Sequence, residues 1–66
     1  MEMTEYIKGF LKMRENMISE AGSEQDRQMA FSYCAGFLNA SKLSGQISHY
    51  EYKFLYNDTQ KLARKM

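Results

Sequence analysis

The chain of 66 residues has one cysteine, Cys34, and one histidine, His49. A lone cysteine cannot form an internal disulfide, and this pair falls short of the about four ligands that a structural zinc site needs. A core of this size supplies only about 3–5 kcal/mol of net stability. Small domains therefore usually need a disulfide, a bound metal, very close packing or a partner chain. We therefore expect no metal or cofactor, and stabilisation by helix packing, self-association or both.

Proline, valine and tryptophan are absent, whereas methionine, leucine, alanine, lysine, glutamate and glutamine are plentiful. The plentiful residues lose little side-chain freedom in a helix, so the composition favours an all-α fold. Without proline, helices have to end at glycine, serine or asparagine.

Neither sign of charge dominates: the chain has nine Lys and Arg residues and eight Asp and Glu residues, for a net charge of +1. This balance excludes a polybasic, histone-like protein. The chain also lacks a basic-plus-apolar leader and a long uncharged run, so we expect neither a signal peptide nor a membrane span. Together with the lone thiol, these features predict a cytoplasmic protein.

The clearest helix-ending signals are Gly22–Ser23 and Ser44–Gly45. Each glycine can adopt the left-handed conformation that ends a helix, and a serine that can cap the next helix follows each one. Ser48 with Glu51 three residues later is a full capping box. Ser23 is instead followed, three residues later, by the shorter acid Asp26.

These signals predict helices at about 4–21, 24–43 and 49–65. Because the connections are short, neighbouring helices should run antiparallel. We therefore expect a single helical domain, residues 1–66, folded as an up-down-up three-helix bundle. The alternative is an extended helical hairpin that completes its core in a homodimer.

Apolar residues recur on one side of each predicted helix at the 3.6-residue period. On the first helix they are Met3, Tyr6, Ile7, Phe10, Leu11, Met13, Met17, Ile18 and Ala21. On the second helix they are Met29, Ala30, Phe31, Tyr33, Cys34, Phe37, Leu38, Ala40 and Ser41. On the third helix they are Tyr52, Leu55, Tyr56, Thr59, Leu62, Ala63 and Met66. The wide arc of the second helix suits a central helix that contacts both others, and Gly36 near its edge would allow close helix approach.

Arg14 interrupts the apolar stripe of the first helix. A buried unpaired guanidinium is very unfavourable, so this side chain has to reach water or a carboxylate. In a bundle with short loops Asp58 lies at about the same height, which predicts an Arg14–Asp58 contact. The alternative is that Arg14 lies at the edge of the stripe and extends to solvent.

The third helix carries more aromatic rings than one stripe can bury. Tyr50 and Phe54 lie one turn apart away from its apolar side, Tyr56 adds another ring, and Lys53 and Lys61 are nearby. Exposed rings beside cations are typical of residues that anchor a protein interface. We identify these five as the candidate partner-binding residues. A second interpretation needs no partner: Phe54 could be buried against the 44–48 loop.

No residue pattern predicts catalysis. Cys34 lies on the apolar side of the second helix, where a thiol is usually an inert small hydrophobe. His49 begins the third helix, several turns away, so the two form no dyad. We find no phosphate-binding glycine loop and no paired carboxylates in an apolar cleft. The sequence therefore predicts a protein that is not an enzyme.

Three functional interpretations remain. The first is a protein-interaction module that binds itself as a homodimer, a host protein or both; accessory and inhibitor proteins of phages and mobile elements often have this size. The second is a DNA- or RNA-binding regulator that uses the third helix as a recognition helix, presenting His49, Tyr50 and Lys53. Near-neutral charge and the acid Glu51 on that helix argue against it. The third, membrane-surface binding through the first helix, competes with the core for the same residues.

Overall fold

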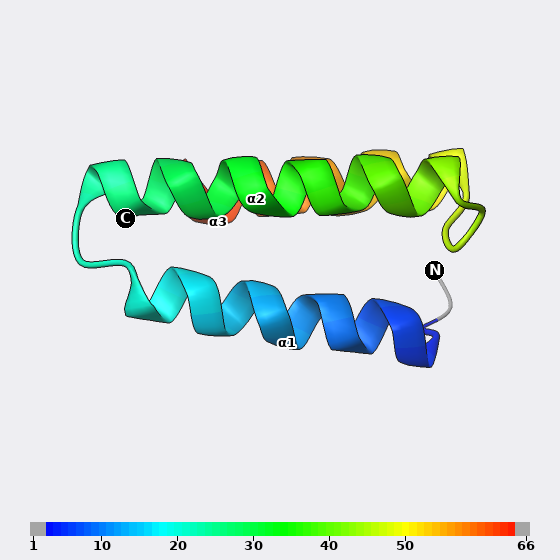
Figure 1. Cartoon of the computed structure of the whole chain (residues 1–66), viewed down its shortest axis with the longest axis horizontal. Coiled ribbons are helices and arrows are strands. Elements are labelled where there is room, and N and C mark those ends of the chain that lie inside the picture. Colours follow the sequence, from blue (N-terminus) through cyan, green and yellow to red (C-terminus); the bar gives the residue numbers. More distant parts are fainter. Residues whose placement is uncertain (1–2, 65–66) are drawn as a thin grey trace.

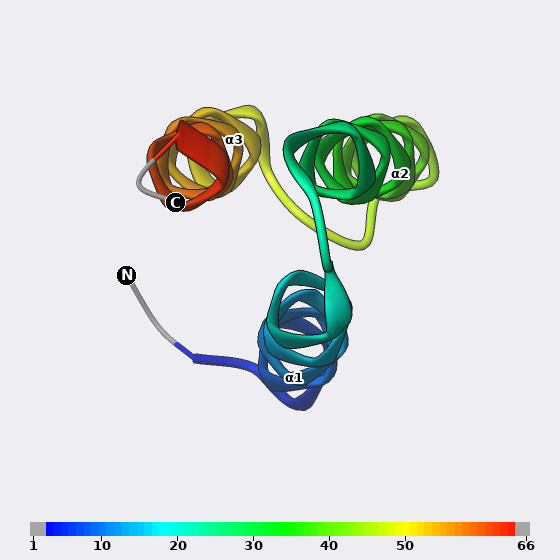
Figure 2. The ribbon, with the colours of Figure 1, turned by 90° about the vertical axis from the view of Figure 1, so that its left-hand side faces the viewer.

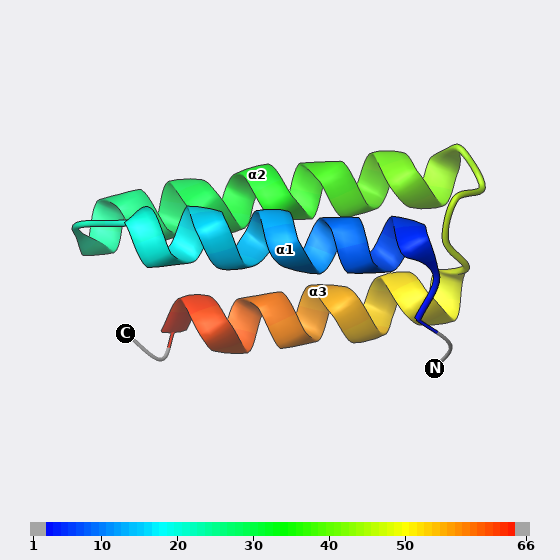
Figure 3. The same cartoon turned by 90° about the horizontal axis from the view of Figure 1, so that it is seen from below.

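The computed structural model describes residues 3–64 and contains three helices within that range. They are α1 (Glu5–Glu20), α2 (Glu24–Leu43) and α3 (His49–Arg64). Consecutive helices run in opposite directions and lie side by side (Figure 1, Figure 3). The predicted up-down-up three-helix bundle is therefore confirmed, and the extended-hairpin alternative is wrong. Lys65 and Met66, which the sequence assigned to the third helix, lie outside the described residues.

Side-chain caps start all three helices. Thr4 accepts a hydrogen bond from the backbone N–H of Ile7 (3.1 Å) at the start of α1. At α3, Ser48 and Glu51 satisfy each other's backbone N–H groups, at 3.0 and 2.8 Å, as the capping box predicts. These bonds satisfy donors that a helix start otherwise leaves without partners.

At α2 the shorter acid changes the capping pattern. Ser23 accepts from the N–H of Asp26 (3.1 Å), as expected of a cap. The Asp26 carboxylate, however, accepts from Gly22 (3.3 Å), one residue further back than in a full capping box.

The two interhelical glycines behave differently. Gly45 has φ +82°, and its N–H donates to the carbonyl of Lys42 while Gln46 donates to Ser41. This pair of backbone hydrogen bonds is a Schellman motif, which requires the left-handed conformation at Gly45. The expectation of the same conformation at Gly22 is wrong. There, Ala21 closes α1 by donating to Ile18 (3.2 Å) in an extended conformation, so no left-handed residue is needed.

The core lies along the axis between the three helices. Its fully or nearly fully buried members include Ile7, Phe10, Cys34, Leu38, Ile47 and Leu55. Two aromatic stacks join α1 to α2: the ring of Phe37 lies 5.9 Å from that of Tyr6 and 5.7 Å from that of Phe10.

Viewed end-on, the helices form a triangle in which α2 and α3 are closer to each other than either is to α1 (Figure 2). The buried side chains explain the difference. In α2 and α3 most of them are small, namely Ala30, Cys34, Ser41, Thr59 and Ala63, so these backbones can approach closely. The buried residues of α1 are Ile7, Phe10 and Ile18, which hold it further away.

Candidate interaction surfaces

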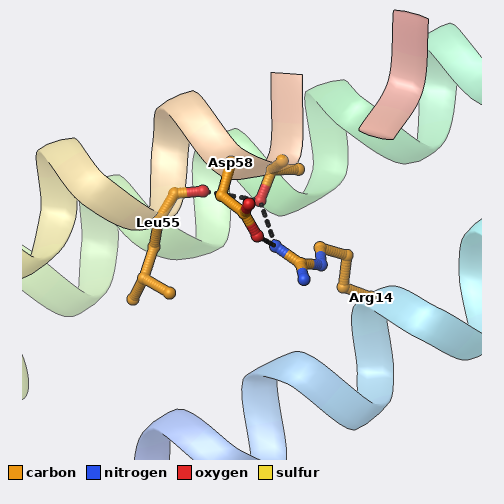
Figure 4. Close-up of polar contacts among 4 residues, drawn as sticks. Arg14, Leu55 and Asp58 are labelled. Atoms are coloured by element: carbon orange, nitrogen blue, oxygen red, sulfur yellow. Dashed lines mark hydrogen bonds and ion pairs between the residues drawn. The ribbon is translucent and has the colours of Figure 1, made fainter. Parts of the chain in front are cut away.

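A polar contact crosses the bundle between α1 and α3 (Figure 4). One terminal nitrogen of Arg14 donates to the Asp58 carboxylate at 2.8 Å and to the Thr59 hydroxyl at 3.2 Å. The Thr59 hydroxyl in turn donates to the carbonyl of Leu55 at 2.7 Å. This confirms the predicted Arg14–Asp58 contact, and it explains how a guanidinium fits an otherwise apolar stripe.

The two residues that could have supported thiol or imidazole chemistry lie in different environments. Cys34 is fully buried in α2, and burial raises the pKa of its thiol while the nearby Arg14 charge lowers it in part. His49 is exposed at the start of α3, where its ring stacks on Tyr52 at 6.4 Å. Within residues 3–64, no three His, Cys, Asp or Glu side chains gather in a way that could hold a metal ion.

The outer face of α3 carries both of the candidate anchor rings. The exposed fraction is 73% for Tyr50 and 52% for Phe54. Phe54 is therefore not buried against the 44–48 loop, which removes the interpretation that placed it there. Lys53 and Lys61 are exposed on the same helix.

Tyr56 does not belong with those two rings. It is half-buried on the side of α3 that packs against α2, where its ring meets Phe31 edge-on at 5.5 Å and lies 5.8 Å from Tyr52. The grouping of Tyr56 with the exposed rings is corrected accordingly. Its position two residues beyond Phe54 turns it about 200° around the helix, toward the core.

The charge on the outer face of α3 is positive. Lys53, Lys61 and Arg64 are exposed, while the two acids of this helix, Glu51 and Asp58, are partly covered. None of the three cations forms an ion pair within residues 3–64, where the ion pairs are Lys8–Glu5 and Arg14–Asp58. The outer face of α3 thus combines exposed aromatic rings with cations that form no ion pair within residues 3–64.

A second exposed apolar face lies on α2, and the sequence assigned it to the core. The exposed fraction is 63% for Met29 and 58% for Tyr33, and Ala40 is exposed as well. These residues form the edge of the wide arc that was expected to contact both other helices. The arc is wider than two neighbouring helices can cover, so one edge of it faces solvent. Leu43, outside the predicted arc, is 77% exposed.

Two open grooves flank the C-terminal half of α1. One, of about 350 Å³, lies between α1 and α2, and its lining includes Met17, Met29 and Tyr33. The other, of about 340 Å³, lies between α1 and α3, and its lining includes Leu11 and Leu62. Their positions follow from the wider spacing of α1 in the bundle.

No protein-family description matches this chain, and neither the curated proteins nor the solved structures compared with it give a match. None of the helices in residues 3–64 has the length and apolar character needed to cross a membrane.

Proposed function

We propose that this protein is a small, non-enzymatic interaction module that binds another protein through the outer face of α3. The binding residues are Tyr50, Lys53, Phe54 and Lys61. The observation that carries the proposal is the exposure of two aromatic rings one turn apart, on a helix whose core positions are already filled by other residues.

Physical chemistry favours an interface for this face. Burying an aromatic ring removes a large apolar area from water, and aromatic residues dominate the energetics of interfaces for that reason. Tyr50 and Phe54 lie four residues apart, so both can enter one groove, as in helix-in-groove recognition. A protein that occupies a partner's surface in this way needs no catalytic group.

The charge of the face indicates the partner's chemistry. Lys53 and Lys61 lie on the same face as the rings, and both acids of α3 already accept hydrogen bonds within the chain. We therefore propose an apolar groove with an acidic rim as the partner's surface, because complementary charge speeds association and excludes wrong partners. A cytoplasmic accessory or inhibitor protein of a phage or mobile element would work in this way.

Nucleic-acid binding is the second candidate, favoured by the cations Lys53, Lys61 and Arg64 on one face. The helix arrangement weighs against a helix-turn-helix reader. In that motif the two helices cross at about 90–120°, with the second in the major groove. Here α2 and α3 lie side by side in opposite directions along their lengths (Figure 3).

A capture experiment with matched variants tests the proposal. Tagged protein is immobilised at low density and exposed to bacterial lysate, with and without nuclease. We expect a discrete protein that survives nuclease treatment, binds the wild type and is lost from Phe54→Ala. Removing such an anchor costs about 2 kcal/mol or more, which weakens binding about 30-fold.

Tyr33→Ala is the control, because it removes an equally exposed ring from α2 instead of α3. It should retain the partner, and circular dichroism should show unchanged helicity in both variants. Equal loss in both variants, or unfolding of Phe54→Ala, would contradict the proposal. Loss of the captured material after nuclease treatment would favour the nucleic-acid alternative.

A further inference from the structure

The exposed face of α2 has a coiled-coil spacing. Met29, Tyr33, Gly36, Ala40 and Leu43 follow one another at intervals of four, three, four and three residues, and all five are exposed. This spacing aligns side chains along one side of a helix so that they can meet a second helix. We call these five residues the α2 seam.

No charged side chain interrupts the seam. Every exposed residue of α2 from position 28 to position 43 is uncharged, in a chain in which 26% of residues are charged. The only charged residue in that span is Lys42, which is half-buried and lies over the ring of Tyr52, 4.4 Å from its centre. A solvated helix face normally carries charges, and their depletion is typical of an interface core.

Gly36 makes no close approach to another helix within one copy of the chain. A Cβ atom added there would meet nothing within 4 Å, so the expected close approach of a helix of the same chain is absent. Glycine inside a helix is less favourable than alanine. A residue without a side chain at the centre of an exposed apolar face does, however, allow another backbone to come close.

We propose that the α2 seam binds a second copy of this chain, with the two α2 helices antiparallel and a two-fold axis at Gly36. The seam is complementary to itself in this arrangement. Met29 of each copy faces Leu43 of the other, and the large Tyr33 lies within one residue, about 1.5 Å along the axis, of the small Ala40. Such a self-complementary patch is what a two-fold dimer requires, and an uncharged face meets its own copy without repulsion.

The α1–α2 groove supplies a receptor for the most exposed residue of the seam. The groove of about 350 Å³ lies at the N-terminal end of α2, and most of its lining is apolar. Its lining residues are Met17, Ala21, Met29, Ala30 and Tyr33, together with the acidic residues Glu20 and Asp26. Leu43 lies at the opposite end of α2 and has 77% of its surface exposed. The antiparallel pairing brings Leu43 of one copy to the groove of the other, twice per dimer.

The dimer is expected to be weak. One helix pair covers less than the about 800 Å² per partner of a standard interface, and interfaces below that size are mostly weak or transient. The outer face of α3 lies on a different helix and is not part of the seam (Figure 2). The inference is therefore independent of the proposed function, and either can fail alone.

Sedimentation equilibrium from about 10 µM to 1 mM tests the dimer. We expect concentration-dependent dimerisation of the wild type and at least a tenfold rise in the dissociation constant for Gly36→Lys, which places two charges together at the axis. Gly9→Lys is the matched control: Gly9 is also inside a helix, is exposed, and would have no Cβ neighbour within 4 Å. It should dimerise as the wild type does.

A cross-linking experiment tests the geometry and does not depend on a disruptive change. Gly36→Cys should form an intermolecular disulfide under mild oxidation, because the axis brings the two cysteines together, whereas Gly9→Cys should not. The native thiol, Cys34, is fully buried and stays out of the reaction. A wild type that stays monomeric at 1 mM, a dimer that survives Gly36→Lys, or equal cross-linking of both variants would overturn the proposal.

Discussion

At the scale of single residues, the Arg14 contact places a charge within an otherwise apolar stripe. One terminal nitrogen donates both to the Asp58 carboxylate and to the Thr59 hydroxyl. Asp58 could be named from the sequence, because the stripe required a partner and short loops fixed the height of α3. The part of Thr59 could not, because it depends on the side-chain rotamer that lets its hydroxyl accept from Arg14 while donating to Leu55.

Removing the Asp58 carboxylate should destabilise the fold. The Arg14 side chain is 12% exposed and that of Asp58 is 46% exposed, so the pair lies between a surface pair and a buried one. We expect Asp58→Ala to lower the free energy of unfolding by about 1–2 kcal/mol, because Arg14 keeps its charge in a largely covered position. Urea denaturation followed by circular dichroism measures the change.

The double variant Arg14→Met, Asp58→Ala provides the control. It removes the charge together with its partner and fills the stripe with an apolar side chain, so it should lie within about 1 kcal/mol of the wild type. A double variant less stable than Asp58→Ala would show that the guanidinium contributes mainly through packing rather than through the ion pair.

At the scale of helices, the starts were more predictable than the ends and the outer faces. Caps are local, and Ser48 with Glu51 encodes the start of α3 within four residues. The backbone conformation of Gly22 depended on how α1 ends, which is through the hydrogen bond from the Ala21 N–H to Ile18. The exposure of Phe54 and of Tyr33 depended on which edges the neighbouring helices leave uncovered, and periodicity alone does not contain that information.

Two glycine substitutions should change stability in opposite directions. Gly45→Ala forces an alanine into the left-handed conformation at φ +82° and should cost about 1–2 kcal/mol. Gly36→Ala has ordinary helical geometry and open space around its Cβ, so it should gain up to about 1 kcal/mol. Both are measured by thermal or urea unfolding at low micromolar concentration, where the monomer prevails. Destabilisation by Gly36→Ala would mean that its backbone is constrained in a way that the helix geometry does not explain.

At the scale of the whole molecule, the fold class followed from composition, helix signals and short loops, but the uneven spacing of the helices did not. That spacing is set by the sizes of the buried side chains taken together. The small buried residues Cys34, Thr59 and Ala63 allow α2 and α3 to pack closely, whereas the larger Phe10 and Ile18 keep α1 further away. The two grooves beside α1 are the result.

This asymmetry predicts that α1 opens before the rest of the bundle. Local opening free energies follow packing density, and α1 has open grooves on both sides of its C-terminal half. Native-state hydrogen exchange should therefore show the amides of Met17 and Ile18 exchanging faster than those of Leu38 and Leu55. The measurement is made at low protein concentration, because the proposed dimer would cover the α1–α2 groove and slow exchange in α1. If all four amides exchange through a single global event, the bundle is one cooperative unit and the looser spacing of α1 carries no energetic consequence.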